Sequence, residues 1–255
     1  MRIGLCQSLP INGDIEKGFS TVENCLSVAA KGGAEMLVFP ELYFPGYNQP
    51  DLHRPLAQTV DGIWIETLSE LTQKYSCGLT LGWAEASGNK VYNSASCFDQ
   101  KGKVLAHYRK IQLFGEMEKQ SFTAGEAYQT FDWNGQKVAL LICYDIEFPQ
   151  HCRALAEQGV TLILVPTANP MGFEHVSRTL VPARAAEMGL TIVYANYCGI
   201  EQGLQYAGLS LIVGSDSQPI AMAGSTETLF ITDLSPIKAA MNANSTQLED
   251  YLEVI

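Results

Sequence analysis

The sequence has few basic residues and no long apolar run. Its 16 Lys and Arg residues are outnumbered by 27 Asp and Glu, which gives a net charge of −11 at pH 7. This acidic balance argues against nucleic acid and anionic membranes as partners, because the field of the protein repels phosphate. No apolar stretch approaches the roughly 18 residues of a membrane span, and the N-terminus lacks the basic and apolar segments of a signal peptide. We therefore predict a cytoplasmic protein.

The sequence also lacks the cysteine and histidine patterns of disulfide frameworks and metal sites. Its seven cysteines are odd in number and include no Cys-x-x-Cys pair, so reduced thiols and no structural zinc are expected. His151 and Cys152 are adjacent, but neighbouring positions of a helix point in different directions, and no further ligands are spaced to close a site. No metal and no cofactor are predicted.

No linker, charge run or low-complexity segment divides residues 1–255, which predicts a single domain. Apolar strand patterns are interspersed with amphipathic helix patterns, and GGAEMLVFPE at 32–41 is similar to QGVTLILVPT at 158–167. This repeat indicates two related halves packed on each other. We expect an α/β fold of four layers, helix, sheet, sheet and helix. Segment 235–255 is expected to contain a short helix and a polar C-terminal tail.

The periodicity places the individual elements. Helices are expected to begin at Asp14, Asp61 and Pro149 and to lie near 174–188, whereas 113–125 has no clean period and is expected to be a loop, as is the position of His53. Strands are expected at 2–7, 36–40, 78–84, 90–99, 103–108, 130–133, 138–142, 161–166, 190–195, 208–213, 219–222 and 228–232.

Cys143 ends the apolar run VALLIC, and a polar turn and Pro149 follow it. A strand that ends in a sharp turn before a helix can present a nucleophile and aim backbone N–H groups at it. This pattern predicts an exposed thiol held clear of the sheet. The alternative is a buried structural cysteine, and Cys143 taken alone favours that alternative.

Glu41 and Lys110 also follow predicted strands, at the edge where α/β sheets collect their sites. Each taken alone is better explained as a surface charge. Together with Cys143 they suit cleavage of an amide. A nearby ammonium lowers the pKa of a thiol, a carboxylate supplies the base, and hydrogen-bond donors stabilise the oxyanion that forms.

Three segments around these residues carry a resemblance to a known family. They are LVFPELYFPGY around Glu41, HYRKIQLFGEMEKQSFTAG around Lys110 and LLICYDIEFPQHCRALAEQG around Cys143. In this chain order they resemble the three catalytic signatures of the nitrilase, or carbon–nitrogen hydrolase, superfamily. LVPTANP, VPARAAEMGLTIVYAN and YAGLSLI match later segments, so the resemblance covers nearly the whole chain. It implies an αββα sandwich that forms an αββααββα homodimer through its helices and C-terminal tail.

The resemblance also implies roles for individual residues. Cys143 is implied as the nucleophile, Glu41 as the general base and acid, and Lys110 as a charged donor to the tetrahedral intermediate. The backbone N–H of Tyr144 is implied as the second donor, and Glu118 as the residue that positions the substrate and the lysine. For Glu118 the alternative is a surface charge in an acidic loop. The pocket candidates are Tyr47, Ala168, Asn169 and Phe173, together with Tyr43 and Tyr197.

The implied reaction is hydrolysis of a small linear amide through a cysteine thioester, with release of ammonia and a carboxylate. IQLFGEMEK, ICYDIEFP, LVPTAN and YANYCG are most similar to the amidase branch that includes 4-guanidinobutyramide hydrolases, which suggests a substrate with a cationic far end. N-carbamoyl amidohydrolases and true nitrilases share the same three residues. A Cys–His protease-like site and an inactive binding protein of the same fold are the remaining alternatives. Arg184 and Glu187 match an RA-x-E stretch and are expected to form a scaffold pair.

Overall fold

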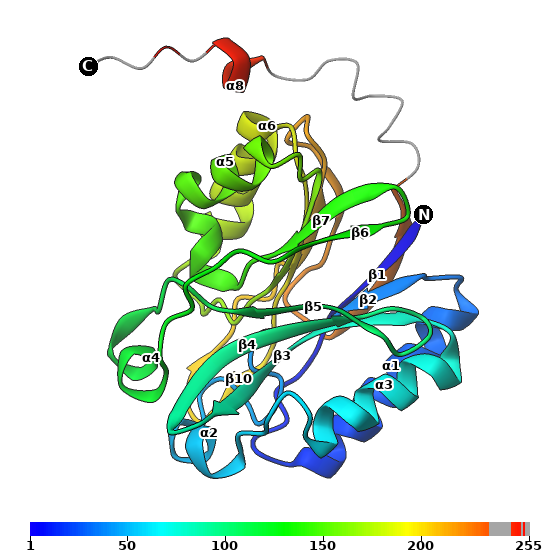
Figure 1. The fold of residues 1–255 in the computed structure, drawn as a ribbon, viewed down its shortest axis with the longest axis vertical. Coiled ribbons are helices and arrows are strands. Elements are labelled where there is room, and N and C mark those ends of the chain that lie inside the picture. Colours follow the sequence, from blue (N-terminus) through cyan, green and yellow to red (C-terminus); the bar gives the residue numbers. More distant parts are fainter. Residues whose placement is uncertain (235–245, 251, 253–255) are drawn as a thin grey trace.

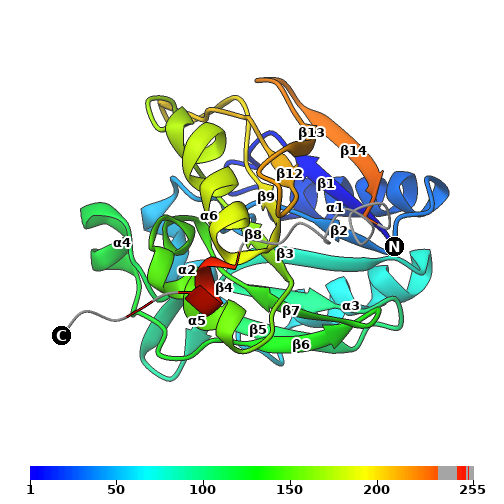
Figure 2. The same ribbon diagram turned by 90° about the horizontal axis from the view of Figure 1, so that it is seen from above.

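The computed structural model describes residues 1–234, 246–250 and 252, so the helix expected near residue 235 lies outside the described residues. Two six-stranded sheets pack face to face, and helices cover the outer face of each sheet (Figures 1 and 2). The predicted four-layer α/β arrangement is therefore confirmed.

The first sheet has the strand order β14-β1-β2-β3-β4-β5, with β1, β2 and β3 parallel to one another. Strand β4 runs antiparallel to both of its neighbours, so β5 points in the same direction as β2. The C-terminal ends of β2 and β5 consequently lie at the same edge of the sheet. The strands are β1 (Arg2–Gln7), β2 (Met36–Val38), β3 (Gly78–Ser87), β4 (Lys90–Phe98), β5 (Val104–Arg109) and β14 (Thr228–Asp233).

The second sheet has the order β13-β12-β9-β8-β7-β6, and its β7, β8 and β9 are parallel. Strand β8 here and β2 in the first sheet are each the middle member of three parallel strands, as the sequence repeat predicts. The hairpin of β6 and β7 turns at Asn134-Gly135. The strands are β6 (Thr130–Trp133), β7 (Gln136–Leu140), β8 (Leu162–Pro166), β9 (Thr191–Ala195), β12 (Leu211–Val213) and β13 (Pro219–Met222).

Helices α1 (Ile15–Lys31) and α3 (Ile63–Tyr75) cover the first sheet, whereas α5 (Pro149–Glu157) and α6 (Val181–Met188) cover the second (Figure 1). Asp14 caps α1, as predicted, because its side chain accepts a hydrogen bond of 3.0 Å from the N–H of Lys17. Val22, Leu26 and Ala29 recur at helical spacing and are buried against the sheet. No helix among the described residues is long and apolar enough to cross a membrane.

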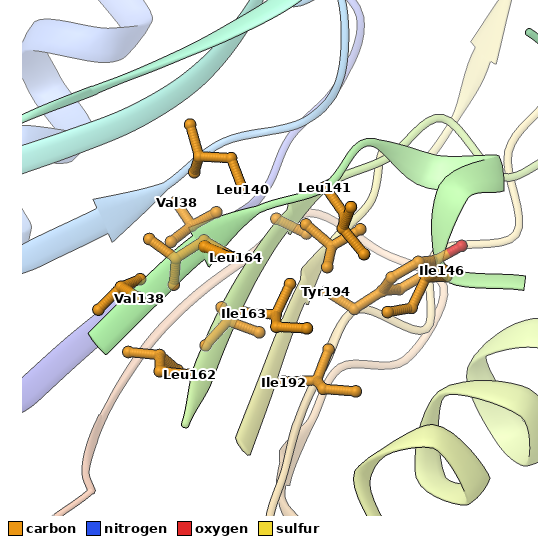
Figure 3. Close-up of a cluster of buried hydrophobic side chains, with 14 of the residues drawn as sticks. Val38, Val138, Leu140, Leu141, Ile146, Leu162, Ile163, Leu164, Ile192 and Tyr194 are labelled. Carbon is orange, nitrogen blue, oxygen red and sulfur yellow. The ribbon is translucent and has the colours of Figure 1, made fainter. Parts of the chain in front are cut away.

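The core fills the space between the two sheets and the layers between each sheet and its helices. Figure 3 shows Val38 of β2 beside Leu140 of β7 and Leu164 of β8, with Ile163 and Ile192 on the opposite side of the second sheet. Both faces of these strands are buried, which explains why their sequences read as continuous apolar runs rather than as alternating ones. Each such side chain contributes about 1.5–3 kcal/mol through burial.

Short elements depart from the predictions. The expected loop 113–125 contains the helix α4 (Gly115–Ser121), and His53 lies in the helix α2 (Pro50–Leu56) rather than in a loop. A small hairpin of β10 (Ile200–Glu201) and β11 (Leu204–Gln205) was not predicted. Elements of one or two turns bury too few residues to show a period, so tertiary contacts decide whether they form.

Candidate active site

Glu41, Lys110 and Cys143 meet where the two sheets face each other, because each follows the C-terminal end of strand β2, β5 or β7. The ammonium of Lys110 lies 2.6 Å from Oε1 of Glu41, and both side chains are completely buried. The charges of Glu41 and Lys110 both act on the thiol of Cys143. The structure thus brings together the three residues that the sequence singles out.

Lys110 is held between two carboxylates. Its Nζ donates hydrogen bonds to Oε1 of Glu41 at 2.6 Å and to Oε1 of Glu118 at 2.7 Å. Glu118 also accepts from the hydroxyl of Tyr47 at 2.8 Å and, through Oε2, from the N–H of Phe114 at 3.1 Å. Glu118 lies in α4 and is fully buried, so its interpretation as a surface charge is wrong. These contacts fix the position of the ammonium.

The carboxyl group of Glu41 has one engaged and one free oxygen. Oε1 accepts from Nδ2 of Asn93 at 2.7 Å as well as from Lys110. Oε2 is buried and has no hydrogen-bond partner among the described residues. Burial raises the pKa of Glu41 to about 7, although the charge of Lys110 opposes the shift. A carboxyl group with a free oxygen and a pKa near neutrality suits a general base and acid.

Cys143 occupies a strained backbone position. Its φ of 46° lies in the left-handed region, which residues other than glycine seldom adopt. A 3₁₀ turn, η1 (Cys143–Glu147), separates β7 from α5, so the strand does not pass directly into the helix. The residue is only 9% exposed, and the predicted exposed thiol is therefore wrong. The turn that contains Cys143 packs against β8 and α6, and the local sequence does not reveal these contacts.

Asp145 fixes the turn that follows Cys143. Its Oδ2 accepts from the N–H of Ile142 at 3.0 Å and from the hydroxyl of Tyr108 at 2.8 Å. Its Oδ1 accepts from the N–H of Gln112 at 2.7 Å. The buried carboxylate of Asp145 thus connects the turn at Cys143 to β5 and to the segment after Lys110. These contacts fix the position of the Cys143 sulfur relative to the Lys110 ammonium.

The pKa of the Cys143 thiol is raised well above its usual range, although the ammonium of Lys110 acts to lower it, as expected. Burial is the largest cause and the charge of Glu41 adds to it, whereas Lys110 opposes the shift only in part. The neutral thiol of Cys143 is thus favoured over its thiolate. It needs a base at the moment of attack, and the carboxyl group of Glu41 is in place to serve as that base.

A cluster of half-exposed aromatic rings includes Tyr144, the residue that directly follows Cys143. Tyr144 packs edge-on against Phe114 at 5.1 Å between ring centroids and against Phe148 at 4.9 Å. Phe173 meets the other side of Phe114 at 5.6 Å. Of the predicted pocket residues, Phe173 belongs to this aromatic cluster. The role of the Tyr144 N–H as an oxyanion donor stays a prediction.

The other pocket candidates have structural contacts. Ala168 and Asn169 are buried, and Asn169 donates from its backbone N–H to Oδ1 of Asn196 at 2.8 Å and from its side chain to the carbonyl of Phe173 at 2.9 Å. Asn169 therefore braces the loop that carries Phe173. Tyr43 and Tyr197 have no exposed surface and lie in the core on the α1 side of the first sheet.

Three residues of the site were not singled out by the sequence. They are Asn93, which contacts Glu41, Phe114 of the aromatic cluster, and Thr167, whose backbone carbonyl accepts a hydrogen bond from the N–H of Glu41. Asparagine is depleted in strand interiors, so Asn93 within the predicted strand 90–99 was a usable signal. Phe114 and Thr167 lie in irregular segments and carry no comparable signal.

The described histidines have partners elsewhere. His107 contacts Oγ of Ser96 at 3.0 Å and Oε2 of Glu85 at 2.9 Å, as expected for a satisfied strand residue. His151 contacts the hydroxyl of Tyr128 at 2.7 Å. The charged groups that act on Cys143 are Glu41, Lys110 and Glu118, which disfavours a Cys–His pair.

Two further predictions concern the scaffold and metal sites. Arg184 and Glu187 form the predicted i, i+3 ion pair at 2.9 Å, and Arg184 also donates to the carbonyl of Glu147 at 3.1 Å, which braces η1. In the part of the chain that the structure describes, no group of three or more His, Cys, Asp or Glu residues could hold a metal ion.

Comparison with known proteins adds independent evidence. Residues 2–240 match the family model of the carbon–nitrogen hydrolases. The (R)-stereoselective amidase of Pseudomonas sp is 34% identical over 243 residues, which cover 94% of this chain and 88% of that protein. The nitrilase of Pyrococcus abyssi is 31% identical over 231 residues, which cover 89% of this chain and 86% of that protein.

The fold is similar to that of solved amidase structures. A mutant of the amidase from Nesterenkonia sp. AN1, which carries an acrylamide adduct at its active-site cysteine, superimposes with a TM-score of 0.89 at 33% identity and covers 98% of this chain and 96% of that chain. A second mutant of that amidase, in complex with butyramide, gives a TM-score of 0.85 at 31% identity over 98% of this chain and 95% of that chain.

Proposed function

The chain belongs to the carbon–nitrogen hydrolase family, and we propose that it hydrolyses small linear amides with Cys143 as the nucleophile. Glu41 acts as the general base and acid, and Lys110 stabilises the tetrahedral intermediate. The observation that carries this proposal is the convergence of a buried carboxyl group and a buried ammonium on one buried thiol. All three groups that the reaction needs are present, which favours an enzyme over an inactive binding protein.

Acylation begins with the neutral thiol of Cys143. As its sulfur attacks the amide carbonyl carbon, the free Oε2 of Glu41 takes the thiol proton. The oxyanion of the tetrahedral intermediate accepts hydrogen bonds from Lys110 and from the backbone N–H of Tyr144. Glu41 then donates its proton to the amide nitrogen, the C–N bond breaks, and ammonia leaves a thioester on Cys143.

Deacylation uses the same groups in the same order. The carboxylate of Glu41 takes a proton from a water molecule, whose oxygen attacks the thioester carbonyl. The second tetrahedral intermediate uses the same donors, and the C–S bond then breaks. The proton held by Glu41 returns to the sulfur, so the net reaction converts the amide and one water into a carboxylic acid and ammonia.

The aromatic cluster of Phe114, Tyr144, Phe148 and Phe173 suggests the substrate class. Tyr144 directly follows Cys143 in the chain, and the half-exposed rings of its cluster offer apolar faces to an acyl chain. The amidase of Nesterenkonia sp. AN1, solved with butyramide, provides a neutral aliphatic precedent. We therefore propose a short aliphatic amide as the substrate. A cationic far end, as in 4-guanidinobutyramide, is the second candidate, since aromatic faces also attract cations and the net charge is −11.

A substrate panel tests the reaction class. Ammonia release is measured from butyramide, 4-guanidinobutyramide, an N-carbamoyl amine and butyronitrile under identical conditions. We expect both amides to be hydrolysed at least tenfold faster than the other two compounds, because the site is proposed for amides. Preference for the carbamoyl compound or the nitrile would contradict the proposal. The ratio between the two amides decides whether a cationic end is recognised.

Two substitutions test the assigned roles. Cys143→Ala removes the nucleophile and Glu41→Gln removes the base while preserving its shape, so each should lower kcat by about a thousandfold or more. Cys25→Ser, in helix α1 and outside the site, is the matched control and should stay near wild type. Mass spectrometry after a rapid acid quench should find the acyl group on the peptide that contains Cys143. Near wild-type activity in either variant would overturn the assignment.

We also propose a homodimer, as the family resemblance implies. Light scattering of the full chain should give twice the mass of one chain. A fully active monomer would contradict this expectation without affecting the assigned chemistry.

A further inference from the structure

Two cysteines that the proposed reaction does not use lie in direct contact. Cys6 is in β1 and Cys25 is in α1, and their sulfur atoms are 3.7 Å apart. Cys6 is buried at 3% exposure, whereas Cys25 is only partly buried. The two thiols therefore meet between the first sheet and the helix that covers it. Of the two, Cys25 is partly accessible to solvent.

The environments of the two thiols differ in a way that favours one direction of attack. A hydrogen bond from Cys6 lowers the pKa of Cys25. Burial raises the pKa of Cys77, Cys97 and Cys152 to about 12 in each case. Because the thiolate is the reactive form, Cys25 is the thiol best placed to meet an oxidant. Cys6 is within van der Waals contact to resolve the product.

We propose that Cys6 and Cys25 form a disulfide when the protein meets a hydroperoxide, at a site separate from Cys143. The thiolate of Cys25 attacks one peroxide oxygen, the O–O bond breaks, and a sulfenic acid forms. The sulfur of Cys6 then displaces the hydroxyl group, so the S–S bond forms as the S–O bond breaks. Two thiols lose two electrons and two protons in total, and hydrogen peroxide is reduced to two molecules of water.

The bond requires only a small movement. The two sulfurs must approach from 3.7 Å to about 2.0 Å, which side-chain rotation and a slight shift of α1 can supply. The strand is less free to move, because the neighbouring Gln7 donates to the carbonyls of Gly224 at 3.0 Å and Thr226 at 2.7 Å and accepts from the N–H of Ser210 at 3.0 Å. Oxidation should therefore fasten α1 to a strand that is already anchored.

The test uses the full-length Cys143→Ala protein, so that oxidation of the proposed nucleophile does not interfere. After treatment with a small molar excess of hydrogen peroxide, we expect the intact mass to fall by about 2 Da and a reductant to restore it. Trypsin separates the two cysteines into peptides 3–17 and 18–31, because Lys17 lies between them. Non-reducing digestion should therefore yield one cross-linked species. The melting temperature should rise on the order of 5 °C on oxidation.

Two double variants control the assignment. Cys143→Ala combined with Cys25→Ser should show neither the mass loss nor the rise in melting temperature. Cys143→Ala combined with Cys198→Ser should retain both, although Cys198 is close enough to act electrostatically on Cys6. A cross-link between Cys6 and Cys198, oxygen addition at Cys25 without a cross-link, or no reaction at all would each overturn the proposal. These measurements involve no amide hydrolysis, so their outcome does not depend on the proposed function.

Discussion

At the scale of single residues, Asn93 contributes to the charge state of Glu41. Its amide donates to the oxygen that also contacts Lys110, and this bond favours the ionised carboxylate. In Asn93→Ala the pKa of Glu41 should rise further above 7, because the charged form loses a donor. A base must be ionised, so the ascending limb of kcat/KM against pH should move up by about one unit.

The control for this prediction lies next to Asn93 in the same strand. Ser94 donates to Glu85 at 2.7 Å, outside the proposed site, so Ser94→Ala should leave the limb where it is. A lowered kcat/KM with an unmoved limb in Asn93→Ala would mean that the asparagine only supports the fold.

Replacement of Glu118 should move the ascending limb of the kcat/KM profile to lower pH, opposite to the effect of Asn93→Ala. The negative charge of Glu118 raises the pKa of Glu41, so Glu118→Gln should lower that pKa and shift the limb to lower pH. The variant also weakens one of the two contacts that hold Lys110, at 2.7 Å, so kcat should fall about tenfold or more.

The measurement for Glu118→Gln is the pH profile of kcat/KM together with kcat. An upward shift would contradict the arrangement, as would wild-type kcat. Glu116→Gln, an exposed position in the same helix, is the matched control.

The residues of the site that lie in the three segments resembling the family's catalytic signatures were predictable from the sequence. Glu41, Lys110, Glu118 and Cys143 lie within such signatures, and the structure brings all four together. Burial of Cys143 was not predictable from its own segment, because the turn that contains it packs against β8 and α6, which follow later in the sequence. The direction of its pKa shift followed from that burial and was missed for the same reason.

At the scale of elements, the 3₁₀ turn η1 depends on Asp145. In Asp145→Asn, one of the two acceptor oxygens becomes an NH₂ group that faces a backbone N–H or a hydroxyl. A buried donor left without an acceptor costs about 1–3 kcal/mol, so the free energy of unfolding should fall by about that amount. Urea denaturation measures the change. Asp132→Asn, at an exposed position of β6, should stay within about 0.5 kcal/mol of wild type. Equal stability of the two variants would show that Asp145 does not hold the turn.

Elements that follow an apolar pattern in the sequence were predictable, whereas the short helices and the hairpin of β10 and β11 were not. The strands of both sheets and α1, α3 and α5 follow apolar patterns that are long enough to identify. Helices α2 and α4 have seven residues each, and α4 directs a charged side chain, Glu118, inward to meet Lys110. An inward-facing charge is invisible to hydrophobic periodicity, which explains why the segment was interpreted as a loop.

At the scale of the whole molecule, the site joins the two related halves. Strands β2 and β8 occupy equivalent central places, and the N–H of Glu41 donates to the carbonyl of Thr167, just after β8, at 3.3 Å. Glu41 and Lys110 come from the first sheet and Cys143 from the second, so the packing of the sheets positions the base against the nucleophile. The repeat in the sequence predicted the two halves, but the distances between their chemical groups depend on how the sheets pack.

The net charge of −11 acts over the whole molecule and gives a prediction about substrate capture. If a cationic amide is a substrate, the field should raise its encounter rate at low ionic strength, and added salt should screen that attraction. The value of kcat/KM for 4-guanidinobutyramide should then fall roughly threefold to tenfold between about 0.02 and 0.5 M NaCl, provided that substrate capture limits the rate. Butyramide carries no charge and is the matched control, so its kcat/KM should change little over the same range. Equal salt dependence of the two amides would show that the charge of the protein does not steer the substrate, and would favour the neutral aliphatic amide as the natural class.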